Sequence, residues 1–94
     1  MRITKTLKNS EGYTINEVRA FSITVQGPNG YSETMDLSND GTGIHLTDLE
    51  YGTYTVTENG ADTDYTVDIS GTATLDINNK SGDITVANTE KSDG

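Results

Sequence analysis

Leu49–Gly60 reads LEYGTYTVTENG, and the alternation in this stretch decides how the chain is expected to fold. Side chains of a β-strand point alternately to opposite faces, so Tyr54, Val56 and Glu58 share one face and the intervening threonines share the other. Glu58 therefore extends an apolar row. A carboxylate in a protein core is costly unless it is paired, hydrogen-bonded or protonated. The stretch predicts a central strand whose inward-facing glutamate needs a partner elsewhere in the chain.

The same alternation recurs along the whole sequence. Strand patterns occupy 2–8, 20–26, 31–37, 44–46, 53–58, 64–69, 72–77 and 83–89. Clusters of Gly, Asn, Asp and Ser separate them, and helical periodicity of useful length is absent. Short strands at this spacing predict an all-β fold, an antiparallel-rich β-sandwich of about seven to nine strands. We expect residues 1–90 to form a single domain and residues 91–94 to be a polar C-terminal tail or linker.

The apolar rows also predict which side chains face the core. The expected set is Ile3, Leu7, Phe21, Ile23, Val25, Tyr31, Met35, Leu37, Tyr54, Val56, Tyr65, Val67, Ile69, Ala73, Leu75, Ile77, Ile84 and Val86. Glu33 falls on such a row too, but a sheet edge or a bulge would expose it. Only 31% of the residues are hydrophobic, which predicts a sparse core. Sixteen threonines favour strands instead, because β-branched residues suit solvent-facing strand positions.

Composition excludes several classes of function. Fifteen acidic and six basic residues give a net charge of −9, which argues against nucleic acid and anionic membranes as partners. No apolar run is long enough to span a membrane, and no signal peptide precedes the first strand pattern. Two interpretations follow, a cytosolic protein or one module of a longer chain, and we favour the second. The chain has no cysteine, hence no disulfide and no thiolate metal site. An extracellular domain with a sparse core would need another covalent staple.

Three polar residues interrupt three apolar rows: Lys5 in the first strand, Glu58 in the central strand and Asn88 in the last. In a dry pocket, burial favours a neutral amine and a neutral acid. If Asn88 lies against Lys5, its amide carbon is an electrophile for that amine. A protonated Glu58 would polarise the carbonyl and then pass a proton to the departing ammonia. The product would be an isopeptide bond, and near-attack geometry contributes roughly 7–11 kcal/mol to such reactions.

These residues carry a resemblance to a known family. Ile3-Thr4-Lys5-Thr6, the Leu49–Glu58 stretch and Val86-Ala87-Asn88-Thr89 resemble the B-type (CnaB) domain of collagen adhesins, a prealbumin-like, Ig-like sandwich of Gram-positive surface proteins and pilins. The resemblance implies a cross-link between Lys5 and Asn88 with Glu58 as its catalyst. Ala87 departs from the pattern, because an aromatic residue often precedes the asparagine in such domains.

The resemblance also implies a role. We expect a structural stalk or spacer domain of a cell-surface adhesin or pilin, outside the cell at the cell wall, monomeric, with neighbouring domains of the same protein as partners. Such a domain is not an enzyme in the usual sense, since Glu58 would act once, on its own chain. No cofactor or metal is expected.

Other interpretations remain open. Lys5 could reach water from an edge strand, Glu58 could end a strand in solvent, Asn88 could satisfy backbone groups, and the three could stay hydrogen-bonded without reacting. The alternative function is a binding module whose loops at 27–31 or 38–45, with Tyr13, Tyr31 and Tyr51, recognise a host protein or glycan. His45 has no catalytic partner by spacing. Calcium ligands could come from Asp62, Asp64 and Asp68, or from Asn39, Asp40 and Asp48, without a recognised loop motif.

Overall fold

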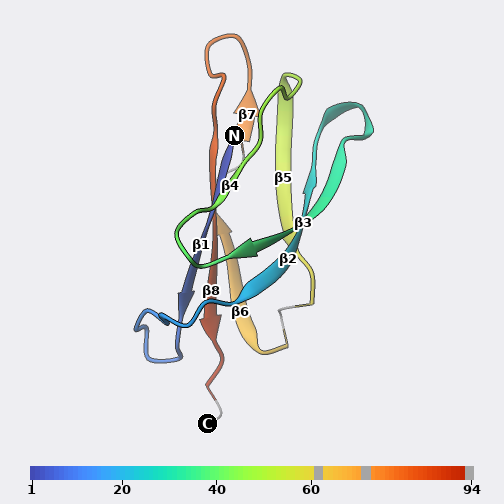
Figure 1. Cartoon of the computed structure of the whole chain (residues 1–94). Helices are drawn as coiled ribbons and strands as arrows, with labels where there is room; N and C mark the ends of the chain where they lie inside the picture. The colour runs from blue at the N-terminus through green and yellow to red at the C-terminus, as the bar shows by residue number, and fades with distance from the viewer. Residues whose placement is uncertain (61–62, 71–72, 93–94) are drawn as a thin grey trace.

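The computed structural model of the chain describes residues 1–60, 63–70 and 73–92. It is elongated, 47 × 22 × 17 Å, and within the described residues it is built from strands and one 3₁₀ turn (Figure 1). The elements are β1 (Arg2–Lys8), β2 (Ala20–Gln26), η1 (Pro28–Gly30), β3 (Ser32–Ser38), β4 (Ile44–His45), β5 (Gly52–Glu58), β6 (Tyr65–Ser70), β7 (Ala73–Leu75) and β8 (Asp83–Glu90). None of them is a helix of the length and hydropathy that a membrane crossing needs.

The strands form two four-stranded sheets that face each other. One sheet has the order β4-β1-β8-β6 and the other the order β3-β2-β5-β7. Every pair in them is antiparallel except β1 with β8, which run parallel as neighbours. The predicted all-β, antiparallel-rich sandwich is therefore confirmed. Alternation along single strands explains this result, because each strand offers one apolar face that only a second sheet can bury.

The core lies between the sheets and contains most of the predicted inward residues. Those buried in one cluster are Ile3, Ile23, Val25, Leu37, Tyr54, Val56, Ala73, Leu75, Ile84 and Val86. Gly52 lets β5 start close to η1: its φ is +148°, and a Cβ there would lie 2.8 Å from Cγ of Pro28. Glycine avoids both the strained backbone and the clash.

Ile77 is a correction, because it is 73% exposed rather than inward. β7 ends at Leu75, and the side chain of Asp76 then accepts hydrogen bonds from the backbone N–H groups of Asn78 and Asn79. This turn breaks the alternation one step before Ile77. Thr72, the expected start of that strand, lies outside the described residues.

Glu33 behaves as an edge residue. It lies opposite Val25, on the inner face of the sheet, yet its side chain is exposed, because β3 is the edge strand there. A charge on the inner face of an edge strand disfavours pairing with another chain.

Candidate functional site

β1 and β8 place Lys5 and Asn88 side by side. In the parallel register Lys5 lies opposite Val86, and Asn88 lies opposite Leu7. The two polar residues therefore stand on the same face of neighbouring strands, two positions apart. Both belong to rows that are otherwise buried, and the residues themselves are only 8% and 1% exposed. The sequence predicted inward orientation for both side chains; their neighbouring strands are a finding of the structure.

Glu58 approaches from the opposite sheet. It is the last residue of β5 and lies opposite Ile23 of β2, so it continues the row of Tyr54 and Val56 at the end of the strand. Its side chain is only 1% exposed, and that of Lys5 is 0% exposed. The partner that the strand alternation required for Glu58 therefore lies in the opposite sheet.

The three side chains form one contact network. Nζ of Lys5 donates to Oδ1 of Asn88 over 2.6 Å and lies 3.1 Å from each carboxylate oxygen of Glu58. Nδ2 of Asn88 donates to Oε1 of Glu58 over 2.7 Å. Among the described residues, no buried side-chain nitrogen or oxygen lacks a hydrogen-bond partner. The three side chains therefore serve as hydrogen-bond partners for one another.

Burial changes the proton affinity of the amine. It lowers the pKa of Lys5 from the ordinary value of 10.5, while the hydrogen bond and the charge of Glu58 oppose that shift. The desolvation of two charges makes a buried ion pair a poor source of stability, since an apolar pair of similar volume often serves as well. A buried amine whose pKa is lowered and which lies against a buried acid is more typical of sites that do chemistry.

The amide of Asn88 turns its oxygen to Lys5 and its nitrogen to Glu58. The amine thus touches the carbonyl whose carbon it would attack, and the acid touches the nitrogen that would leave. Oε1 of Glu58 contacts both nitrogens, so one oxygen can accept a proton from Nζ and deliver it to Nδ2. The expected polarisation of the carbonyl by Glu58 differs from this arrangement, in which the carbonyl oxygen accepts from Lys5.

Four residues around the network were not assigned to the site from the sequence. The ring of Phe21 lies 4.1 Å from Nζ of Lys5, and Tyr65 packs on Phe21. Arg19 and Glu90 lie beyond Tyr65. Alternation predicted inward positions for Phe21 and Tyr65, which was the available signal. Arg19 lies in a segment with no clear strand pattern, so no sequence signal indicated its contact.

The remaining candidates do not form a site in the described part of the chain. His45 is exposed on β4. Within the described residues, no group of three or more His, Cys, Asp or Glu side chains is arranged to hold a metal. Asp40 accepts hydrogen bonds from Thr42, and Asn39 binds backbone groups of 15–19. Asp62 lies outside the described residues.

Comparison with known proteins gives one family. A model described as "Domain of unknown function (DUF5979)" matches residues 1–91. No curated protein matches the chain, and no solved structure matches it.

Proposed function

The chain belongs to the DUF5979 family, domains of unknown function, and we propose that it is a structural stalk or spacer domain of a bacterial cell-surface adhesin or pilin. An autocatalytic isopeptide bond between Lys5 and Asn88 would strengthen it. The observation that carries the proposal is the contact of 2.6 Å between Nζ of Lys5 and Oδ1 of Asn88, beside a buried Glu58. The resemblance of the sequence to CnaB domains supports the same assignment.

The proposed reaction is a single condensation. Glu58 takes a proton from the Lys5 ammonium, and the neutral amine attacks Cγ of Asn88. The Nζ–Cγ bond forms, the Cγ–Nδ2 bond breaks, and Glu58 passes the first proton to the leaving nitrogen, which departs as ammonia. Glu58 then takes the second proton that Nζ loses and gives it to the ammonia. One ammonium and one primary amide thus give one secondary amide and one ammonium ion, with the Glu58 carboxylate regenerated. The folded core supplies the orientation that makes amide exchange feasible.

The strand arrangement supports a mechanical role. β1 and β8 run parallel, and Asn88 lies opposite Leu7, two positions beyond Lys5 in their common direction. A force applied between the ends would enter through β1, cross the bond and leave through β8 without reversing direction. β1 and β8 run along the length of the molecule as neighbours (Figure 1). The strands between them would carry no load.

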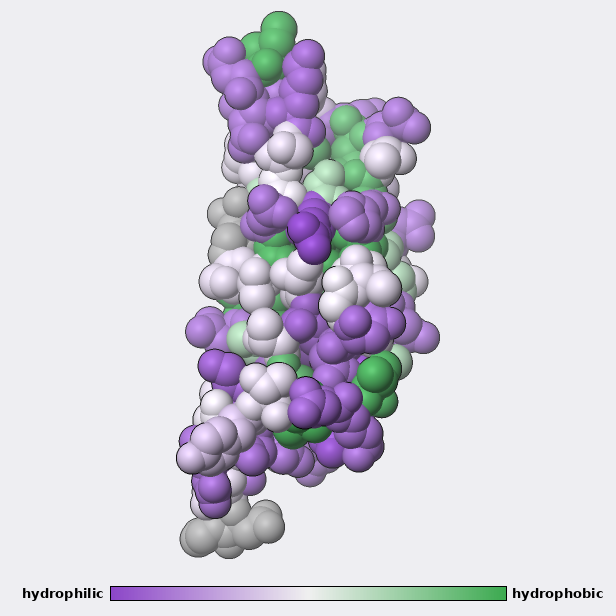
Figure 2. Space-filling view, turned by 60° about the vertical axis from the view of Figure 1, so that its left-hand side comes forward, coloured by the Kyte–Doolittle hydropathy of each residue, from purple (hydrophilic) through white to green (hydrophobic). Residues whose placement is uncertain are grey.

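The surface favours a spacer over a binding module. Hydrophilic residues cover much of the face in Figure 2, and hydrophobic ones form small separate areas. Tyr31 is half-buried against Tyr54. Tyr13 and Tyr51 are exposed, but they lie at opposite ends of β1. Tyr13 lies beside the C-terminal end of that strand, and Tyr51 lines a groove together with Met1, just before the strand begins. Scattered tyrosines do not build a contact surface of the kind that interfaces use. The proposed partners are therefore neighbouring domains at the cell wall.

Intact mass tests the proposal. The purified protein is expected to be lighter than its sequence by one ammonia. Glu58→Gln is expected to have the full mass of its own sequence, because glutamine cannot carry the proton from Nζ to Nδ2. Trypsin should leave Lys5 uncleaved in the wild type and yield residues 3–8 joined to residues 81–91.

The joined peptide serves as the internal control. Loss of ammonia at another asparagine would leave Lys5 open to trypsin, so that residues 3–5, 6–8 and 81–91 appear as separate peptides. Circular dichroism of Glu58→Gln establishes that the variant folds. A wild type that keeps its full mass after long incubation in the folded state would contradict the proposal.

The rate of ammonia loss is expected to be bell-shaped in pH. The reactive pair shares one proton between Lys5 and Glu58, so the rate falls when a second proton binds and when the last one leaves. Because burial lowers the pKa of Lys5, the alkaline fall should begin below 10.5. Chemically synthesised chain, refolded at a series of pH values and quenched for mass spectrometry, gives the profile. A rate that still rises above pH 10.5 would exclude the acid role of Glu58.

A further inference from the structure

Two aromatic rings close the sandwich over the network. Phe21, from β2, lies with its ring centroid 4.1 Å from Nζ of Lys5. Tyr65, from β6 in the other sheet, packs edge-on against Phe21, with centroids 5.3 Å apart and planes at 85°. The pair therefore spans the two sheets beside the triad, and Phe21 excludes water from one side of the amine.

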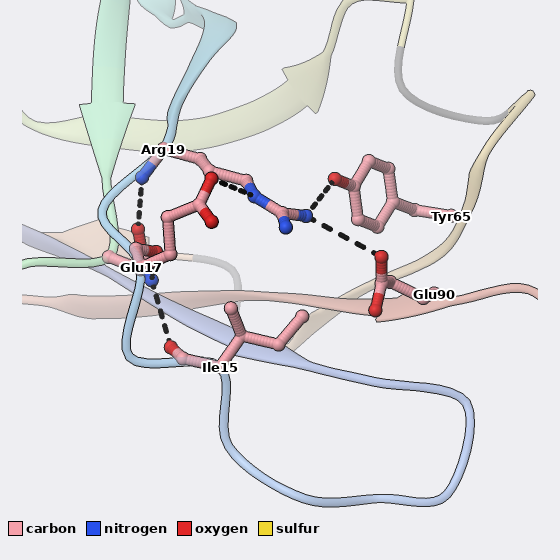
Figure 3. Close-up of polar contacts among 6 residues, drawn as sticks. Ile15, Glu17, Arg19, Tyr65 and Glu90 are labelled. Carbon is pink, nitrogen blue, oxygen red and sulfur yellow. Dashed lines mark hydrogen bonds and ion pairs between the residues drawn. The ribbon is translucent and has the colours of Figure 1, made fainter.

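Arg19 connects the segment before β2 to the opposite sheet. Its Nη1 donates to the hydroxyl of Tyr65 over 2.8 Å and lies 3.5 Å from Oε2 of Glu90, while its Nε donates to Glu17 over 3.3 Å (Figure 3). The hydrogen bond to Tyr65 and that to Glu17 raise the pKa of Arg19, so the guanidinium stays charged. We call Arg19, Tyr65 and Glu90 the latch.

The backbone behind Arg19 is fixed. Its N–H donates to Oδ1 of Asn39 over 2.7 Å, and Nδ2 of Asn39 donates to the carbonyls of Ile15 and Glu17 over 3.2 and 3.0 Å. One asparagine thus holds three points of the segment that leads into β2. Arg19 and Phe21 are two residues apart, so the segment that positions the guanidinium also positions the ring.

The latch lies next to the reacting amide, because Glu90 is the next residue after Asn88 on the same face of β8. Glu90 follows Asn88 by two residues on β8, and both face the interior side of that strand. In the register of β6 with β8, Tyr65 lies opposite Glu90 and Val67 lies opposite Asn88. The register that puts Glu90 beside Tyr65 in the latch therefore also puts Asn88 beside Val67.

We propose that the latch holds Phe21 and Tyr65 closed over Lys5, Glu58 and Asn88, and so sets the rate at which the isopeptide bond forms. The inference rests on the proposed function. Arg19, Tyr65 and Glu90 are positioning residues, because they act on the reaction through the rings that keep water from the amine. Both carboxyl oxygens of Glu58 contact Nζ, and the latch residues take no part in that contact.

The test compares refolding of the chemically synthesised full chain with that of Arg19→Met and Tyr65→Phe. Arg19→Met removes the guanidinium, and Tyr65→Phe removes only the hydroxyl that it binds. Ammonia loss near neutral pH is expected to slow about fivefold in Arg19→Met and less in Tyr65→Phe. Water then reaches Lys5, so the alkaline limb of the pH profile should also move up toward 10.5.

Arg2→Met is the matched control. Arg2 is exposed on β1, and its replacement changes the net charge by the same amount as Arg19→Met. It is expected to react at the wild-type rate with the wild-type profile. If Arg19→Met does not fold, Tyr65→Phe decides the question.

The outcomes separate the two proposals. The latch proposal would be overturned by variants that lose ammonia as fast as the wild type. It would also be overturned by variants that lose ammonia more slowly while the alkaline fall of their pH profile stays where it is in the wild type. Either result would leave the cross-link proposal standing. A folded wild type that keeps its full mass would overturn the cross-link, and the latch with it.

Discussion

Stretched between its ends, the native chain is expected to lengthen very little, whereas a chain without the bond should release up to roughly 290 Å of backbone. Lys5 and Asn88 are 83 positions apart in the sequence, and the bond would remove all the chain between them from the load path. Only the residues outside the bond would extend. The expected difference is nearly the whole contour length of the domain.

Single-molecule pulling of the domain between marker domains measures that length. The comparison uses Lys5→Met/Glu58→Leu/Asn88→Val, in which apolar side chains replace the network and no amine or amide remains to react. Unfolding of this variant should give one long extension per domain. An equally long extension from the wild type would mean that no covalent tether joins β1 to β8.

The second large effect is on stability. Closing a loop of this length destabilises the unfolded chain by about 4.5 kcal/mol in the chain-entropy treatment used for disulfides. Native domains have about 5–15 kcal/mol in total, so the bond contributes a large share. At about 4–8 °C per kcal/mol for a domain of this size, the midpoint of thermal unfolding should rise by roughly 20–35 °C.

Two variants separate the tether from the polar network. The apolar triple variant lacks the tether and leaves no buried charge, so its difference from the wild type in denaturant unfolding contains the tether without the cost of an unpaired buried charge. Glu58→Gln lacks the tether and also leaves Lys5 buried without its carboxylate, which costs about 3–5 kcal/mol more. We expect the free energy of unfolding to be highest for the wild type, lower for the triple variant and lowest for Glu58→Gln. If the wild type and the triple variant were equally stable, the expected stabilisation by the tether would be contradicted.

Much of the site follows from the alternation of single strands. Lys5, Glu58 and Asn88 each interrupt an apolar row, and their inward orientation was predicted because a strand repeats every two residues. The structure brings all three together. Ile77 was predicted wrongly by the same rule, because the side chain of Asp76 forms a turn that the alternation does not encode.

The orientation of the Asn88 amide could not be predicted from the sequence. Contact of Glu58 with Nδ2 of Asn88, and of Lys5 with Oδ1, depends on how two sheets approach each other. The latch is the same kind of feature. Arg19 reaches Tyr65 across 46 positions of sequence, from a segment with no periodic pattern.

The sequence by itself determined the strands, the faces they bury and the three polar residues carried inward, because all of these depend on backbone geometry within one strand. Only the tertiary structure decided that β1 and β8 are parallel neighbours, that Glu58 meets them from the other sheet, and that Arg19 bonds to Tyr65, which packs on Phe21. Those choices depend on pairing and register between distant segments, which only the folded core fixes.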